Sequence, residues 1–195
     1  MEEIVDLRIV EEPKKPMAMH PKKFGMWLFL ASVMMLFMSL TSAYIVRQAE
    51  GNWVFFELPS LFYLTSIIII GSSVSMQWAF FAAKKDNQEM TKTMVLITTI
   101  LGLLFLIGQF FGWKQLVAGS IYLVGNPSGS FLYILTGLHA LHIISAIVFL
   151  LIVLISAFKG RIHSKNMAQV EMCTTYWHFL GGLWLYLFIF LLLYR

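Results

Sequence analysis

Three histidines in the last third of the chain combine ionisable chemistry with apolar surroundings. His139 and His142 lie in the segment 136–142, and His178 follows Glu171 by seven residues, inside another long apolar stretch. An ionisable side chain at membrane depth is costly. Such a residue usually faces the interior of a helix bundle and marks a packing, lipid or proton-handling site. We therefore take these residues as the starting point for a candidate site.

The spacing of these residues predicts two polar helix faces. His139 and His142 are three residues apart, which places them on one face of a helix. Glu171 and His178 are separated by almost two full helical turns, so they also share a face. We expect one hydrogen-bonded cluster in which His178 bridges Glu171 and His142. The candidate structural or lipid-binding residues are His139, His142, Glu171, Tyr176, Trp177 and His178.

Three interpretations of these residues compete. Haem ligation would use His139 or His142 on one side of the iron and His178 on the other, but there is no second matching pair. A proton path would need further ionisable groups, and the apolar stretches before these segments contain no Asp, Glu, Lys or Arg to continue it. The third interpretation is a buried polar cluster that fixes helix packing and holds lipid head groups.

The cysteine content limits the metal chemistry that is available. Cys173 is the single cysteine of the chain, which excludes an internal disulfide and a metal site with several cysteine ligands. With a lone cysteine and with histidines that packing explains, we expect the isolated chain to bind no haem, copper or other metal.

The composition indicates the elements that position these residues. Of 195 residues, 59% are hydrophobic and only 12% are charged, whereas a soluble globular protein has about 25% charged residues. The charges cluster and leave long uncharged gaps, each sufficient for the roughly 20 residues with which a helix crosses a bilayer. Helices satisfy every backbone group within the segment. The sequence therefore predicts an integral, all-α membrane protein.

The number of helices depends on the longest uncharged gap, the 44 residues between Lys114 and Lys159. The segment Gly125-Asn-Pro-Ser-Gly129 breaks regular structure, and the part before it is too short to cross. This gap therefore holds one helix, and the chain forms a bundle of five transmembrane helices. The expected helices are 24–46, 60–83, 93–113, 130–158 and 172–194.

The distribution of lysine and arginine predicts the orientation of the bundle. Eleven of these residues precede the first helix or lie between helices 2 and 3 or 4 and 5, and three lie on the other side. The positive-inside rule then places the N-terminus in the cytoplasm and the C-terminus outside. Residues 1–23 are expected to be a flexible cytoplasmic tail before a membrane domain at 24–195, without a signal peptide. The net charge of +4 reflects this topology and gives no reason to expect nucleic acid as a partner.

Hydroxyl and amide residues inside the expected helices suggest close helix packing. The second helix contains Ser72, Ser73, Ser75 and Gln77, and the third contains Gln109. Small and hydroxyl side chains let membrane helices approach and hydrogen-bond to one another. We expect packing contacts for all of them, with Gln109 bound to a neighbouring helix.

Two C-terminal segments carry a specific family resemblance. They are Phe131-Leu-Tyr-Ile-Leu-Thr-Gly-Leu-His-Ala-Leu-His-Ile143 and Glu171-Met-Cys-Thr-Thr-Tyr-Trp-His-Phe179, the latter followed by Trp184-Leu-Tyr-Leu-Phe188. Weaker matches include Gly25-Met-Trp-Leu-Phe-Leu-Ala-Ser32 and Ser42-Ala-Tyr-Ile-Val-Arg47. Together these segments resemble the subunit III family of haem–copper terminal oxidases, cytochrome c oxidase subunit 3. Five helices in place of seven resemble the short bacterial members of that family.

The resemblance implies a function for the assembled complex and a supporting role for this chain. The complex would be a proton-pumping cytochrome c oxidase of the bacterial cytoplasmic membrane that reduces dioxygen to water. Haem and copper would belong to subunits I and II. This chain would contact subunit I directly, with subunits II and IV as further partners. It would stabilise subunit I, support proton uptake and bind membrane phospholipids.

Two positions depart from the family pattern. Val33 stands where the family usually has a membrane-buried glutamate, and Gly181 stands where it usually has an aspartate. The roles of those carboxylates are therefore not available to this chain. Alternatives to a cytochrome c oxidase subunit are the same subunit of a quinol oxidase or a homologue found beside nitric oxide reductases. A stand-alone haem b membrane protein or a small transporter is a more distant alternative.

Overall fold

Five long α-helices make up the membrane part of the chain. The computed structural model describes residues 21–160, 162 and 166–194. The helices are α1 (Pro21–Ala49), α2 (Ser60–Lys84), α3 (Gln88–Ala118), α4 (Pro127–Phe158) and α5 (Ala168–Tyr194). All five are long and apolar enough to cross a membrane, and the described residues contain no strand. The predicted all-α bundle of five helices is confirmed.

The helices extend beyond the uncharged gaps because polar residues at their ends continue the helical structure. The side chain of Asn126 accepts a hydrogen bond from Ser128 N at 2.9 Å, and Pro127 is the first residue of α4. Proline is favoured there because the first helical N–H needs no partner. Asn87 caps α3 in the same way by accepting from Met90 N at 3.1 Å. Both helices therefore begin before the residues predicted from hydrophobicity alone.

The expected boundary of the N-terminal tail needs a correction. Residues 21–23 belong to the first turn of α1, which begins at Pro21; the rest of the expected tail, 1–20, lies outside the described residues. The helix α5 likewise begins at Ala168, four residues before the expected start.

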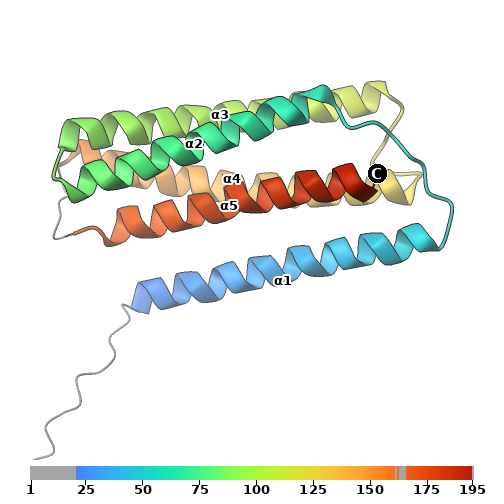
Figure 1. The fold of residues 1–195 in the computed structure, drawn as a ribbon, viewed down its shortest axis with the longest axis horizontal. Helices are drawn as coiled ribbons and strands as arrows, with labels where there is room; N and C mark the ends of the chain where they lie inside the picture. Colours follow the sequence, from blue (N-terminus) through green and yellow to red (C-terminus); the bar gives the residue numbers. More distant parts are fainter. Residues whose placement is uncertain (1–20, 161, 163–165, 195) are drawn as a thin grey trace, which may run out of the picture.

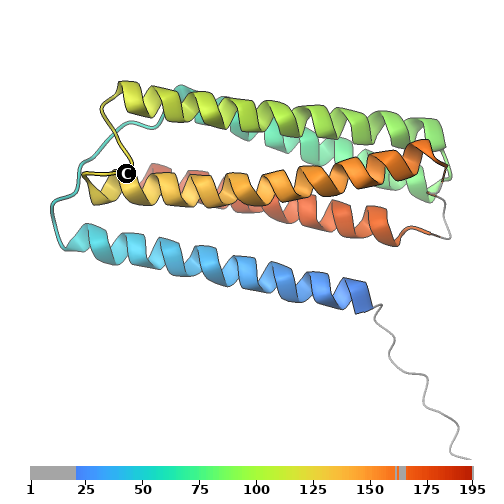
Figure 2. The same cartoon turned by 180° about the vertical axis from the view of Figure 1, so that it is seen from behind.

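Four of the helices form a ring, and the fifth packs on its outside. Each of α2, α3, α4 and α5 packs against two of the others, in the order α2–α3–α4–α5 and back to α2. The helix α1 contacts only α4 and α5 among the described helices. Figures 1 and 2 show α1 lying along the α4–α5 pair on the side away from α2 and α3. Contacts that hold α1 therefore come from α4 and α5.

The connections place the lysine-rich segments together. The start of α1, the α2–α3 connection and the α4–α5 connection lie at one end of the bundle (Figure 1). The end of α5 and the other two connections lie at the opposite end. Which end faces the cytoplasm remains the prediction from the positive-inside rule.

Large aromatic side chains from α5 fill the centre of the ring. Trp184 is fully buried, and its ring centroid lies 5.7 Å from that of Phe62 on α2 and 5.2 Å from that of Phe105 on α3. Its Nε1 donates to Ser66 Oγ at 2.9 Å. Two helical turns earlier in α5, Trp177 Nε1 donates to Ser72 Oγ at 3.1 Å. The serines of α2 therefore hold the indoles of α5, as the packing interpretation of the hydroxyl residues predicted.

Candidate functional site

His139 is a core residue of the bundle. Its side chain is 0% exposed, and its ring centroid lies 5.3 Å from Trp184, 5.9 Å from Phe105 and 6.4 Å from Phe37. Neither ring nitrogen has a hydrogen-bond partner among the described residues. The aromatic rings from α1, α3 and α5 enclose the imidazole, so His139 does not reach the outer surface of the bundle.

His142 lies one turn along α4 and faces α1. Its Nδ1 donates to the backbone oxygen of Leu138 at 2.7 Å, because a carbonyl oxygen can only accept. Its ring centroid lies 5.7 Å from Phe37, which also contacts His139. The prediction that the two histidines share one helix face is therefore confirmed.

Tyr176 and Trp177 join α5 to two different helices. The hydroxyl of Tyr176 lies 2.7 Å from Ser145 Oγ on α4. Trp177 is fully buried and bonds to Ser72 on α2. These two neighbouring residues therefore fix the rotation of α5 about its axis against both α4 and α2.

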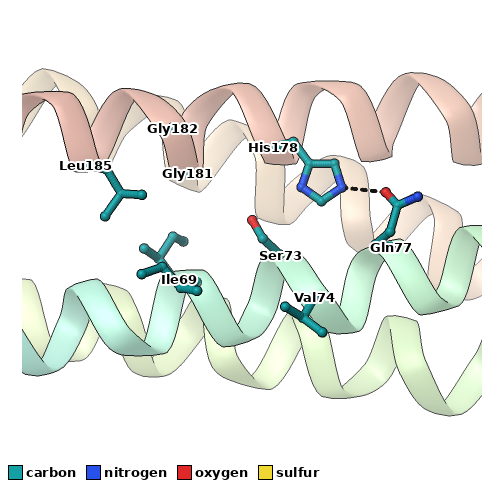
Figure 3. A pocket seen from close by; sticks show the side chains of 9 residues that line it. Ile69, Ser73, Val74, Gln77, His178, Gly181, Gly182 and Leu185 are labelled. Atoms are coloured by element: carbon teal, nitrogen blue, oxygen red, sulfur yellow. Dashed lines mark hydrogen bonds between the residues drawn. The ribbon is translucent and has the colours of Figure 1, made fainter.

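His178 faces α2 and forms one end of a groove between the two helices. Its Nε2 donates to Gln77 Oε1 at 2.9 Å. The groove has a volume of about 290 Å³, and Ser73, Gly181 and Gly182 line it beside the histidine. Figure 3 shows the imidazole and the Gln77 amide side by side, with the glycines of α5 continuing the groove along the helix. The half-buried His178 is therefore accessible from the outer surface of the bundle.

Glu171 lies at the lysine-rich end of the bundle and binds α1. Its Oε2 is 2.6 Å from Lys23 Nζ, and both side chains are partly exposed. Glu171, His178 and His142 thus have three different partners, in α1, α2 and the backbone of α4. The predicted single cluster bridged by His178 is wrong. The seven-residue spacing fixes positions on α5 alone and carries no information on which neighbouring helix supplies each partner.

The sequence predicted the partners of Trp177, His178 and Glu171 only in part. Gln77 and Ser72 were expected to pack, but their pairing with His178 and Trp177 depends on the antiparallel register of α2 and α5. The signal that could have found them is the similar spacing of serines on α2, six residues, and of tryptophans on α5, seven residues, which pairs Ser66 with Trp184 and Ser72 with Trp177. Lys23 was assigned to the tail, so its ion pair with Glu171 was missed.

The contacts that the structure shows for these residues join helices to one another. The histidines that haem ligation would pair have different surroundings: His139 is packed among aromatic rings, and His178 is bonded to Gln77. Within the described helices, the acidic residues are confined to first turns, at Glu89 of α3 and Glu171 of α5. Groups of three or more metal-ligating side chains are absent from the described residues.

The His178–Gln77 pair allows a direct test of its contribution to packing. Replacing Gln77 with Leu and His178 with Phe, singly and together, should give a coupling free energy of about 0.6 kcal/mol, the usual value for hydrogen bonds between membrane helices. The measurement is unfolding by SDS in mixed micelles. Ser73→Ala is the control, since Ser73 lines the same groove. A coupling energy indistinguishable from zero would mean that the pair does not stabilise the α2–α5 contact.

Comparison with known proteins adds information on the family. The family model described as Cytochrome c oxidase subunit III matches residues 12–195. A cytochrome c oxidase subunit 3 of Corynebacterium diphtheriae is 29% identical, over 85% of this chain and 84% of that protein. A cytochrome c oxidase subunit 3 of Synechocystis is 33% identical, over 87% of this chain and 75% of that protein. A probable quinol oxidase subunit 3 of Staphylococcus saprophyticus is 26% identical, over 85% of each.

Proposed function

Since the chain belongs to the cytochrome c oxidase subunit III family, we propose that it is the non-redox subunit III of a proton-pumping haem–copper terminal oxidase. The complex as a whole reduces dioxygen to water. This chain contributes no catalytic residue; it stabilises subunit I, holds lipids and supports proton uptake.

The observation that carries this proposal is the extent of the family match, which covers residues 12–195 and hence every described helix. The chemistry of the bundle supports it. The indoles of α5 and the hydroxyls of α2 bond to each other, and the acids of the described helices lie at helix ends. Such a bundle is built to hold a fixed shape beside a redox partner.

The proposed surroundings follow from the family. Subunit I is the direct partner, subunits II and IV are further neighbours, and haem and copper belong to subunits I and II. The bacterial cytoplasmic membrane is the proposed location, with the lysine-rich end of the bundle in the cytoplasm.

Exposure divides five of the six candidate residues into two groups. His139 and Trp177 are fully buried and support the bundle from inside. His142, Glu171 and His178 are partly exposed and are the members that can touch a phospholipid. We propose that these three contribute to lipid retention, and that Tyr176 positions them through its bond to α4.

The electron donor has two candidates. Cytochrome c is the donor that we propose, and quinol is the alternative because the Staphylococcus relative is a probable quinol oxidase subunit. Oxygen consumption by the purified complex with reduced cytochrome c or with a quinol distinguishes them. The chain supplies no donor site in either case, so the roles of its residues are the same.

The role of the chain predicts a loss of activity that develops over time. A complex that lacks this chain should keep its haem spectra and most of its initial rate, because the redox centres lie in other subunits. Its activity should then decline several-fold faster than that of the intact complex during continuous turnover. The measurement is oxygen consumption followed over many turnovers, together with haem spectra before and after.

The contrary results are specific. Loss of haem on removal of this chain, or a bis-imidazole haem spectrum in the chain purified alone, would mean that it binds a redox centre. An equal rate of activity loss in the complexes with and without this chain would refute the stabilising role.

A further inference from the structure

A groove at the lysine-rich end of the bundle is separate from the candidate site described above. It has a volume of about 950 Å³ and lies where α2 ends and α3 begins. Its walls carry Lys84 and Lys85, three large apolar side chains (Trp78, Phe81 and Met90) and the amide of Asn87. The groove thus combines positive charge with an apolar wall.

The apolar wall extends into the hydrocarbon region. Trp78 precedes Lys85 by seven residues, which at 1.5 Å per residue places it about 10 Å deeper along the helix. Trp78 is 55% exposed and Phe81 is 49% exposed, so both rings face outward beside the groove. Tryptophan below a lysine is the pattern of a membrane–water interface, where the ring lies near the head groups and the cation lies in them.

The two lysines are free to bind an external anion. Within the described part of the chain, neither Lys84 nor Lys85 forms an ion pair. The neighbouring acids face elsewhere: Glu89 binds Lys92 at 2.9 Å, and Asp86 lines a separate hollow with Ala157 of α4. The residues that line the groove include two cations and no acid.

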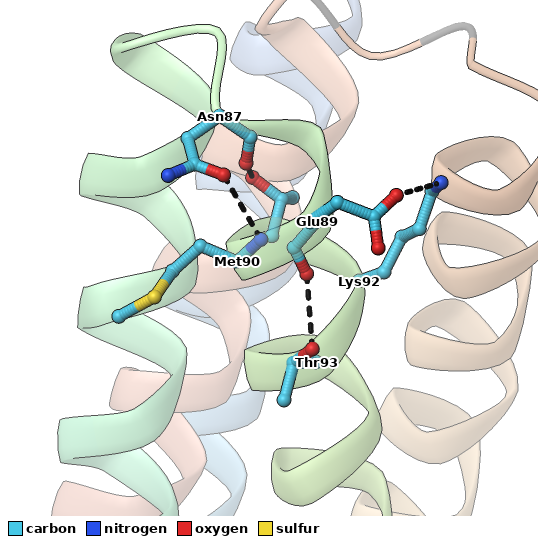
Figure 4. A network of polar contacts seen from close by, with 6 residues as sticks. Asn87, Glu89, Met90, Lys92 and Thr93 are labelled. Atoms are coloured by element: carbon cyan, nitrogen blue, oxygen red, sulfur yellow. Dashed lines mark hydrogen bonds and ion pairs between the residues drawn. The ribbon is translucent and has the colours of Figure 1, made fainter.

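Asn87 adds a neutral donor beside the lysines. Its Oδ1 accepts the hydrogen bond from Met90 N that caps α3, so the orientation of its amide is fixed. Figure 4 shows the amide nitrogen and the Met90 side chain pointing to the same side of α3, away from the Glu89–Lys92 pair. A group bound at this side would meet an N–H donor and two ammonium groups.

From this arrangement we propose that the groove is a binding site for one anionic phospholipid. The phosphate of the head group binds Lys84 and Lys85 and accepts a hydrogen bond from Asn87, while the acyl chains lie along Trp78, Phe81 and Met90. The charge selects an anionic lipid over a zwitterionic one, because two unpaired cations face the head group. The apolar wall selects a lipid over an acidic protein segment. Acyl chains can cover Trp78, Phe81 and Met90 along their whole length, whereas an acidic segment would leave these side chains uncovered.

This inference deepens the lipid-binding part of the proposed function and rests on it. The two remain separable because this groove shares no residue with His142, Glu171 or His178. A failure here would leave the stabilising role of the chain and the lipid contacts of those three residues standing.

The test uses the complete purified oxidase in detergent with two photoactivatable lipids of identical acyl chains, phosphatidylglycerol and phosphatidylcholine. Crosslinks to the peptide that spans 78–90 are counted by mass spectrometry for each retained copy of this chain. A lysine near an anionic surface changes lipid binding roughly fivefold. The variant Lys84→Gln/Lys85→Gln should therefore reduce phosphatidylglycerol crosslinks tenfold or more and leave phosphatidylcholine crosslinks unchanged.

Two controls make the result decisive. Lys159→Gln removes one charge at the same end of the bundle but outside the groove, and it should leave the crosslinks unchanged. The single variants of Lys84 and Lys85 give the same comparison if the double variant is not retained in the complex. Equal crosslinking of both lipids to the wild type, an equal loss in Lys159→Gln, or crosslinks from the lysines to an acidic segment of another subunit would each overturn the proposal.

Discussion

Replacing Trp184 with Ala is expected to destabilise the bundle by about 3 kcal/mol, the low end of the range for tryptophan in soluble cores. The indole is fully buried and packs against Phe62, Phe105 and His139 from three different helices. In a bilayer the unfolded helix remains in lipid, so the transfer from water contributes little. The cavity and the lost dispersion contacts remain, because packing is what holds membrane helices together.

Two further variants separate the ring from its hydrogen bond. Trp184→Phe keeps part of the ring, and Ser66→Ala removes only the acceptor of the 2.9 Å bond from Nε1. Ser66→Ala should cost about 0.6 kcal/mol, with Trp184→Phe between the two. The measurement is SDS unfolding in mixed micelles. A Trp184→Ala variant as stable as Ser66→Ala would mean that the centre of the ring is not tightly packed.

The sequence was sufficient to predict the number and type of the helices because charge is excluded from the bilayer core. Five uncharged gaps gave five helices, and the breaker at Gly125-Asn-Pro-Ser-Gly129 correctly separated α3 from α4. The helix ends were less accessible, since a helix need not stop where the hydrophobic segment stops. At the end of α3, Lys114 Nζ lies 4.9 Å from the ring centroid of Phe110, and the helix continues past it to Ala118.

The candidate site was predicted less well than the fold, for a geometric reason. The helical period predicts which residues of one helix share a face. This prediction was right for His139 and His142, which both contact Phe37. The period does not state which helix lies opposite. Glu171 and His178 share a face by spacing, yet their partners are Lys23 of α1 and Gln77 of α2.

Departures from the family pattern show the same limit. An ideal Cβ on Gly181 would lie 3.1 Å from Ser73 Oγ, so the position faces α2 inside the His178 groove. Val33 is buried in α1, 3% exposed. The sequence marked both positions as unusual. Only the structure shows that Gly181 faces α2 and that the Val33 side chain is buried.

The second large effect is expected from Gly102 of α3, against which the indole of Trp177 packs. An ideal Cβ at this position would lie 2.6 Å from Trp177 Cη2 and 3.3 Å from its Cζ2. The indole is fully buried and held by Ser72, so it has little freedom to move. Gly102→Val should therefore destabilise the bundle by about 2 kcal/mol, as overpacking of a filled core does.

A matched glycine and a compensating change test the cause. Gly71→Val makes the same change on α2, where an added Cβ meets nothing within 4 Å, and it should be close to neutral. Trp177→Phe removes the part of the indole that carries Cζ2 and Cη2. Combined with Gly102→Val, it should cost less than the sum of the two single changes. If the changes in unfolding free energy of the two single variants add up to that of the double variant in SDS unfolding, the loss of stability in Gly102→Val does not come from contact with Trp177. An equal loss at Gly71 would instead assign it to the change of residue type, because valine and glycine differ in helix propensity at either position.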